Sequence, residues 1–267
     1  MKGMVGEIKR YFKIYRIYFK QSLMLLMSHR FNLLMSVVAN VVWTFGQIVS
    51  LRFLFIRIPE IEGWNFNDLV LLLVFGQCAL YLSYIIFEGN LLKLGDKIIA
   101  GDLDNKLTKP IAIKFQLSFE SVMVAQIIPM FVTVIPLFIF GFWGTSVAYF
   151  NLIWAFLVLI LGIIIKYYFT LFLSGTFFFV ERIELLRFIP ELREFNRVPP
   201  SLFPKWIKQV FTFIIPVLLV SYFPLLVAKG GLGVINVLFM EICILTVMML
   251  ISQFVWKKGM RRYSGIG

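Results

Sequence analysis

Residues 150–179 read FNLIWAFLVLILGIIIKYYFTLFLSGTFFF and carry a single charged side chain, Lys166. A helix of roughly 20 apolar residues is long enough to cross the hydrocarbon core of a bilayer, so this stretch alone predicts a membrane-spanning helix. The rest of the chain has the same character, because 60% of its 267 residues are hydrophobic and the mean hydropathy is +0.90. Soluble domains are much less apolar. The sequence therefore predicts an all-α integral membrane protein.

Other apolar stretches predict further spans on both sides of this one. Four of them can be bounded directly, at residues 31–56, 69–89, 116–141 and 233–256. The hydrophilic segments between the spans are too short to form a separate soluble domain. With a sixth span between 178 and 228, discussed below, we expect six transmembrane helices and a single transmembrane domain over residues 31–267.

Charged residues are distributed unevenly among the connecting segments. Basic residues gather before the first span, in the tail after the last, and between the second and third, where five lysines fall within 93–114. The loop at 57–68 is mainly acidic. Because cytoplasmic segments are enriched in Lys and Arg, we expect a multi-pass protein of the cell (plasma) membrane with both termini in the cytoplasm. The net charge of +12 then indicates contact with anionic membrane lipids and not with nucleic acid.

The first segment, residues 1–30, predicts an amphipathic helix lying in the membrane interface. Apolar and basic side chains fall on opposite sides at helical spacing. The apolar side holds Val5, Ile8, Phe12, Tyr15 and Phe19, and the basic side Lys9, Lys13, Arg16 and Lys20. We expect the anchors in the interface to be Lys9, Phe12, Lys13, Arg16 and Lys20. The alternative is the solvated start of a long first helix, whereas we expect a bend near Ser28-His29-Arg30.

The segment 181–208 is too charged for a lipid-facing helix and leaves two topologies open. In the first, it is a cytoplasmic loop and 210–228 crosses the membrane. In the second, 178–198 crosses under the shield of other helices, and 200–228 forms a re-entrant hairpin at the outer face, broken by prolines. The basic residues favour the first topology, and the prolines suit a chain reversal such as the second requires.

The basic loop between the second and third spans predicts a short amphipathic helix. Its apolar side chains recur at three-four spacing and would form one ridge. They are Ile98, Ile99, Leu103 and Leu107. An apolar ridge of this kind fits a groove on a partner protein, and the alternative is a helix lying on lipid headgroups.

Few residues have the spacing of a catalytic or metal site. The sequence has no phosphate-binding loop of the GxxxxGK[ST] type and no CxxC, HExxH or GxSxG motif. The one histidine, His29, lies at a helix end. Asp102 and Asp104 could be metal ligands, but their alternation with lysines favours a solvated or docking surface. We therefore expect a chain that is not an enzyme, with no catalytic residue, metal or cofactor of its own.

Three stretches resemble the ABC-2 type transporter permeases, in particular their small six-span bacterial branch. The first is IIAGDLDNKLTKP at 98–110, which is similar to that branch's first cytoplasmic loop. The second is FPKWIKQVFTFIIPVLLVSYFPLL at 203–226, and the third is the tail WKKGMRRYSGIG at 256–267. They occur in the same relative order as in the family, and the likeness spans nearly the whole chain.

The resemblance implies a permease subunit of an ABC exporter, driven by a separate ATPase subunit that binds the ATP and Mg. It implies a coupling helix in the loop that docks into the ATPase, a homodimer or heterodimer of permeases, and the outer re-entrant hairpin. The residues that match the loop motif are Gly101, Asp102, Leu103, Asp104 and Pro110, and those that match the tail motif are Trp256, Gly259, Arg261, Arg262 and Tyr263. The rival function is an ATP-independent secondary transporter or channel, which should show carboxylates within the membrane or broken helices in matched halves.

Overall fold

The structure is a computed structural model that describes residues 2–28, 30–143, 145, 147–179, 195–196 and 198–263. Its N-terminal half consists of α1 (Lys2–Ser28), α2 (Arg30–Arg57), α3 (Phe66–Ser83), η1 (Tyr84–Glu88), α4 (Gly89–Leu91), α5 (Leu94–Ile99), α6 (Asp102–Leu107), α7 (Ile113–Phe119), η2 (Val124–Gln126) and α8 (Ile127–Phe142). The C-terminal half consists of α9 (Tyr149–Gly175), η3 (Thr176–Phe178), η6 (Pro200–Leu202), α11 (Lys205–Gln209), η7 (Val210–Ile214), η8 (Leu218–Val220), α12 (Tyr222–Ala228) and α13 (Val234–Arg262). No strand occurs among these residues.

Five helical segments among the described residues are long and apolar enough to cross a membrane. They are Arg30–Arg57, Phe66–Ile99, Val124–Phe142, Phe150–Phe178 and Val234–Arg262. A sixth candidate is the pair Lys205–Ile214 and Leu218–Ala228, which is bent by 76° at its break. The prediction of an all-α integral membrane protein is therefore confirmed.

The third span begins later than the hydropathy indicates. The prediction of a continuous helix over 116–141 is wrong, because α7 ends at Phe119 and the membrane-spanning helix starts only at Val124. Pro129 lies in the first turn of α8, where backbone amides have no partner within the helix, so only Pro136 is an interior proline. The apolar side chains of α7 pack inside the subunit, which is why hydropathy alone joins α7 to the span.

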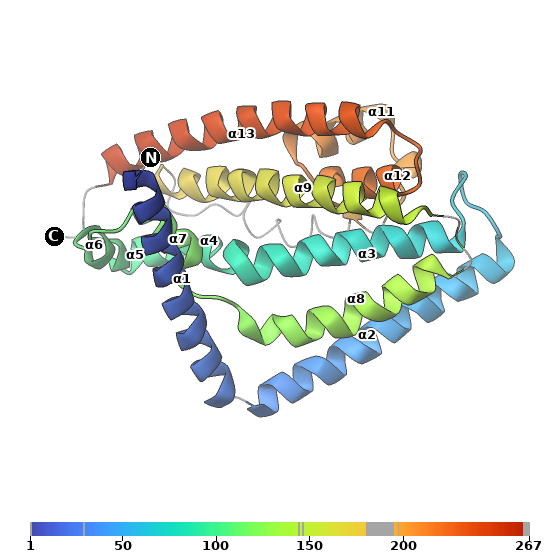
Figure 1. Ribbon diagram of the computed structural model, residues 1–267, viewed down its shortest axis with the longest axis horizontal. Coiled ribbons are helices and arrows are strands. Elements are labelled where there is room, and N and C mark those ends of the chain that lie inside the picture. The colour runs from blue at the N-terminus through green and yellow to red at the C-terminus, as the bar shows by residue number, and fades with distance from the viewer. Residues whose placement is uncertain are drawn as a thin grey trace.

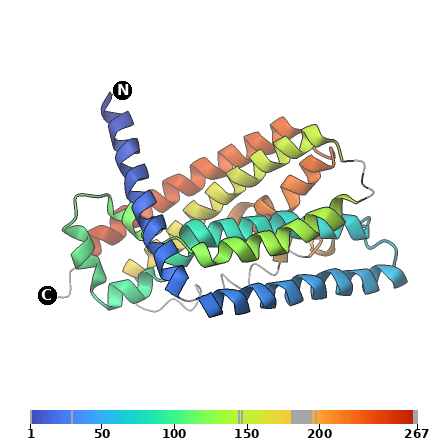
Figure 2. The same ribbon diagram turned by 60° about the horizontal axis from the view of Figure 1, so that its bottom comes forward.

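The long helices form a bundle with α3 at its centre (Figure 1). Helix α8 packs between α2 and α3, and α9 packs between α3 and α13. Most of α3 is buried, whereas α2 has few buried side chains, Thr44 and Phe55, and lies at one edge of the bundle, as Figure 2 also shows. Over most of the length of α2, its side chains therefore point away from the rest of the bundle.

The two ends of the bundle differ in what they hold. At one end, α5, α6 and α7 lie against the C-terminal end of α13 (Figure 1), and we call this group of elements, together with Tyr263, the platform. At the far end, the loop after α2 leads into α3, which begins with a capping box between Asn65 and Asp68. The Lys229 ammonium lies 2.7 Å from the Asp68 carboxylate and joins the end of α12 to the start of α3.

Helix α1 crosses the platform end at a steep angle to the bundle (Figures 1 and 2). It ends at Ser28, and α2, which starts at Arg30, runs in a different direction (Figures 1 and 2), so the predicted bend is confirmed. Tyr11 packs on Phe115 with ring centroids 4.6 Å apart, and Tyr15 packs edge-on to Phe119 at 6.3 Å. One side of α1 is thus fixed to α7.

The segment between α9 and α13 folds back within the bundle. A Cβ on Gly162, near the middle of α9, would lie 2.7 Å from the Leu219 carbonyl oxygen, so η8 reaches the middle of that helix. Lys229, a few residues later, is already at the far end beside Asp68. Helix α11, which begins the segment, also lies towards this far end (Figure 1), so the segment enters and leaves on the same side of the bundle, which favours the re-entrant hairpin over a simple crossing by 210–228. The predicted crossing helix at 178–198 falls largely outside the described residues.

Candidate functional site

The turn between α5 and α6 replaces the single amphipathic helix expected in this loop. Helix α5 ends at Ile99 and is capped by Ala100, and Gly101 follows with φ of +72°, in the left-handed region where glycine has no steric cost. Helix α6 then starts at Asp102. The prediction of one continuous helix is therefore wrong, because its periodicity is interrupted at Gly101.

The four side chains of the expected ridge divide between two environments. Leu103 is completely buried in the main apolar core, and Ile98 packs partly buried against that core. Ile99 and Leu107 are 60% and 47% exposed. The expectation that all four face a partner is wrong for Leu103, which fixes α6 to the subunit, and only Ile99 and Leu107 present large apolar surface.

Glu120 joins the two halves of this turn to α7. Its carboxylate pairs with the ammonium groups of both Lys97 on α5 and Lys106 on α6. The Gln116 amide on α7 adds bonds to the backbone oxygens of Lys106, at 3.2 Å, and Ile111, at 2.8 Å. Sequence reasoning missed Glu120, although the signal was present as a carboxylate inside a stretch assigned to a span.

The tail motif and the loop motif meet in the platform. The Tyr263 hydroxyl donates a hydrogen bond of 3.1 Å to the Asp104 carboxylate. Partial burial and the neighbouring Asp104 raise the pKa of Tyr263 above its ordinary value, so its hydroxyl keeps its proton and donates at neutral pH. Two stretches that were identified separately in the sequence therefore form one contact between α6 and the end of α13.

Trp256 and Gly259 make the end of α13 fit against η3. Trp256 is almost completely buried and lies edge-on to Phe178, with ring centroids 5.4 Å apart. A Cβ on Gly259 would lie 2.6 Å from the Phe178 ring, so this position has no room for a side chain. Arg262 lies over the ring of Phe179 at 5.9 Å. The glycine of the tail motif thus permits close packing of two helix ends.

The remaining residues of the two motifs lie at the surface. Asp102 and Arg261 are exposed. Pro110 is also exposed, and its carbonyl oxygen accepts a hydrogen bond of 2.6 Å from the Arg10 guanidinium of α1. Asp104 is engaged by Tyr263. Among the described residues, no three His, Cys, Asp or Glu side chains come together as a metal site would require.

The residues expected to anchor α1 all lie on its exposed surface. They are Lys9, Phe12, Lys13, Arg16 and Lys20. Phe12 is 64% exposed, whereas Tyr15, assigned to the same apolar side, packs on α7. The expectation of a single apolar face toward lipid is wrong for Tyr15, since part of that face is covered by the subunit itself.

An ion pair lies inside the bundle near the platform. The Lys166 ammonium of α9 is 3.0 Å from the Glu88 carboxylate, and Glu88 is fully buried. Glu88 belongs to η1, a π-helical turn whose Ile85 carbonyl oxygen accepts a bond from the Met123 amide at 3.1 Å. Such turns are frequent at functional sites. The sequence showed Lys166 within an apolar stretch, but nothing in it pairs this lysine with Glu88, which lies 78 residues earlier.

A second buried acid, Glu241, lies on α13. The residue has no exposed surface, and neither carboxylate oxygen has a hydrogen-bond partner among the residues that the structure describes. An isolated carboxylate would be costly in such a place, and a protonated one costs much less. Among the described residues, the buried acids Asp68 and Glu88 thus lie in ion pairs, whereas Glu241 does not.

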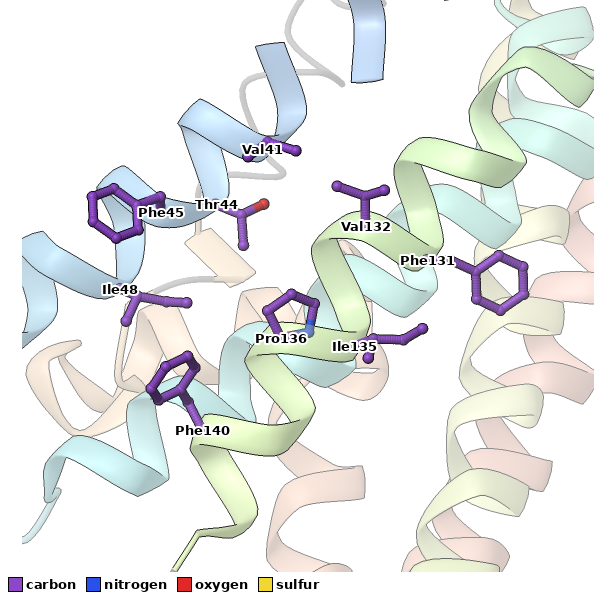
Figure 3. A pocket seen from close by; sticks show the side chains of 9 residues that line it. All are labelled: Val41, Thr44, Phe45, Ile48, Phe131, Val132, Ile135, Pro136 and Phe140. Carbon is purple, nitrogen blue, oxygen red and sulfur yellow. The ribbon is translucent and has the colours of Figure 1, made fainter. Parts of the chain in front are cut away.

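An apolar groove of about 490 Å³ lies between α2 and α8 (Figure 3). Figure 3 shows side chains of α2 facing those of α8, namely Val41, Thr44, Phe45 and Ile48 opposite Val132, Pro136 and Phe140. Thr44 is the one lining residue with a polar side chain. Its hydroxyl donates to the Asn40 carbonyl oxygen at 2.7 Å and contacts the Thr133 hydroxyl at 3.2 Å.

A small polar cluster behind this groove connects three spans. The Tyr81 hydroxyl of α3 donates to the Asn40 side chain of α2 at 2.5 Å and lies 3.2 Å from the Thr133 hydroxyl of α8. Hydrogen bonds of this kind hold helices together where lipid offers no hydrophobic driving force. The cluster therefore joins α2 to the rest of the bundle.

Comparison with known families gives one match. A family model described as an ABC-2 family transporter protein matches residues 41–267, which covers α2 from its fourth turn onward and includes the platform and the groove. No curated protein and no solved structure matches the chain.

Proposed function

The chain belongs to the ABC-2 transporter family, and we propose that it is the permease subunit of an ABC exporter, driven by ATP that a separate ATPase subunit binds with Mg and hydrolyses. The observation that carries the proposal is the platform. It presents Ile99 and Leu107 outward while Leu103 and Glu120 hold the same two short helices firmly to the bundle.

A docking surface that transmits force needs both properties. The exposed apolar side chains give the partner something to bind, and the internal bonds carry a displacement into the spans. From α6, one connection runs through Glu120 to α7, and another runs through Asp104 and Tyr263 to α13. Helix α5 belongs to the same candidate span as α3. Movement of the ATPase would thus reach three elements of the bundle at once.

The rest of the assembly follows from the same proposal. The platform and both termini lie in the cytoplasm, in agreement with the basic residues of that end, and the far end lies outside. Helix α1 lies in the interface of the plasma membrane, with Lys9, Lys13, Arg16 and Lys20 among anionic headgroups. A second permease, identical or related, completes the transport path.

The docking role can be tested by cross-linking. A photoreactive amino acid placed at Leu107 should form an adduct with a protein that mass spectrometry identifies as a P-loop ATPase. The matched control is the same substitution at Ile58, which is 47% exposed at the far end and should give no such adduct. An ATPase adduct of equal yield at Ile58, or adducts at Leu107 to lipid alone, would contradict the proposal.

A pair of double variants tests the same surface without a cross-linker. Ile99→Asp with Leu107→Asp should leave the subunit folded and abolish co-purification with the ATPase, because both side chains are exposed and only the docking surface is altered. Ile58→Asp with Leu232→Asp changes two comparably exposed residues of the far-end loops and should retain the ATPase. Equal retention in the two double variants would contradict docking through the platform.

The ion pair of Glu88 and Lys166 is the observation that supports the rival function, an ATP-independent secondary transporter or channel, because secondary transporters use charged residues within the membrane. The permease alone, reconstituted in vesicles with a pH-sensitive dye, distinguishes the two functions. We expect no proton or ion flux without the ATPase. A flux that Glu88→Gln abolishes would establish the secondary transporter.

A further inference from the structure

A second cavity, of about 570 Å³, lies where α1 bends into α2, against the connection from α7 to α8. Its lining combines polar and apolar side chains, unlike the groove between α2 and α8. Lys93 supplies a positive charge, and no Asp or Glu contributes to the lining. A cavity with this lining suits an anion and not a cation.

The polar side chains of the cavity fall into two groups. Two are already used, since the Ser22 hydroxyl accepts a hydrogen bond from the Val122 amide and Ser121 donates to Asn90. The others have no hydrogen bond or ion pair to any described residue. They are the side chains of Lys93, Asn32, Ser36 and Gln126. An ammonium, two amides and a hydroxyl, all able to donate, therefore border one cavity, where Lys93 and Asn32 are exposed and Ser36 and Gln126 are half-buried.

The apolar part of the lining comes from the two sides of the bend and from residues 122–125 of the connection after α7. Leu25 and Leu26 of α1 and Leu33 of α2 lie beside the polar groups. If α1 lies in the membrane interface, as the proposed function holds, the bend is at the level where headgroups meet acyl chains. The polar and apolar walls then match the two parts of a lipid molecule at that depth.

We propose that this cavity binds an anionic glycerophospholipid of the leaflet in which α1 lies. The phosphate pairs with the Lys93 ammonium in a charge-assisted contact and accepts hydrogen bonds from Asn32, Ser36 and Gln126. An acyl chain follows Leu25 and Leu33 toward the bilayer. The bound lipid joins α1, α2 and the connection that follows α7, three parts of the chain that meet at this point.

Native mass spectrometry of the purified full chain, titrated with phosphatidylglycerol in detergent, tests the proposal. We expect Lys93→Gln to weaken binding of this lipid about tenfold, as loss of a charge-assisted contact would, and Lys93→Arg to retain it. Lys109→Gln removes an equal charge from the exposed surface of the platform, outside the cavity, and should leave binding unchanged. Equal weakening by Lys93→Gln and Lys109→Gln would overturn the site in favour of general surface attraction.

Further titrations identify the source of the anion and guard against misfolding. Phosphatidylcholine and soluble glycerol 3-phosphate should both bind at least about tenfold more weakly than phosphatidylglycerol, because one lacks net charge and the other lacks acyl chains. Binding of glycerol 3-phosphate as tight as that of the lipid would overturn the assignment to lipid. Gln126→Leu, which keeps the charge, should weaken lipid binding less than Lys93→Gln. The cross-linking experiment at Leu107 is independent of these titrations. A failed lipid site therefore leaves the docking proposal intact, and a failed cross-link leaves the lipid site intact.

Discussion

At the platform, Glu120 pairs with two lysines, Tyr263 bonds to Asp104, and Gly259 brings two helix ends into close contact. Along the edge of the bundle that α2 forms, α2 meets α8 across an apolar groove, and the Thr44 and Thr133 hydroxyls form a hydrogen bond between the two helices. The first region is specified by charge and close packing. The second is specified by apolar surface and by uncharged hydrogen bonds alone, those of the cluster that joins Asn40 of α2 to Tyr81 and Thr133.

This difference predicts different mechanical behaviour. A partly buried ionic network loses stability when one partner is removed, because the remaining charges are left without their counter-ion, so the platform should move as one body. Apolar helix surfaces gain little from each other in place of lipid, so α2 can change its packing against α8 cheaply. The contrast suits a subunit that receives force at the platform and rearranges at its edge.

The largest effect should come from filling the space at Gly259. Gly259→Ala places a methyl group against the Phe178 ring, and overpacking of this kind costs about 3 kcal/mol. Gly46→Ala, on α2, is the matched control, because a Cβ there meets no atom within 4 Å. It should leave stability unchanged or raise it slightly, since alanine favours helix. Thermal unfolding in detergent, followed by size-exclusion chromatography, measures both, and equal midpoints would contradict the contrast between the regions.

A smaller loss should follow removal of the charge at Glu120. Glu120→Gln leaves the half-buried Lys97 and Lys106 without their carboxylate, and we expect the free energy of unfolding to fall by about 2 kcal/mol. This is less than the cost of breaking a fully buried ion pair, because both lysines retain some exposure. Asp96→Asn, on the exposed side of α5, removes an equal charge and should change stability by less than about 0.5 kcal/mol. The same unfolding assay measures both variants. If Glu120→Gln is as stable as Asp96→Asn, the ion pairs of Glu120 with Lys97 and Lys106 do not hold the platform together.

The smallest effect should come from the edge itself. Thr44→Val removes the hydroxyl that contacts Thr133, and hydrogen bonds between membrane helices average about 0.6 kcal/mol. The midpoint of thermal unfolding should therefore hardly change. A spin label on α2 should nevertheless report greater mobility of α2 relative to α8. A shift as large as that of the Glu120 variant would mean that α2 is fixed as firmly as the platform.

The sequence predicted the platform residues better than their arrangement. Gly101, Asp104, Gly259 and Tyr263 were all identified from the two motifs, yet nothing in either motif shows that they meet. Leu103 was assigned to a surface ridge because helical periodicity was carried through Gly101, where the helix breaks. Glu120 was overlooked because the apolar side chains of α7 hid the end of that helix within a predicted span.

The sequence by itself determined the membrane class, most of the spans, the helix at the N-terminus and its bend, because hydropathy and helical periodicity are sums over neighbouring residues. Only the tertiary structure decided which charges are paired, since Glu88 and Lys166 are 78 residues apart and Asp104 and Tyr263 are 159 apart. It also decided which apolar side chains face inward. In a chain that is apolar on nearly every side, hydrophobicity does not distinguish a helix face that packs on protein from one that meets lipid, and that choice depends on how the helices fit together.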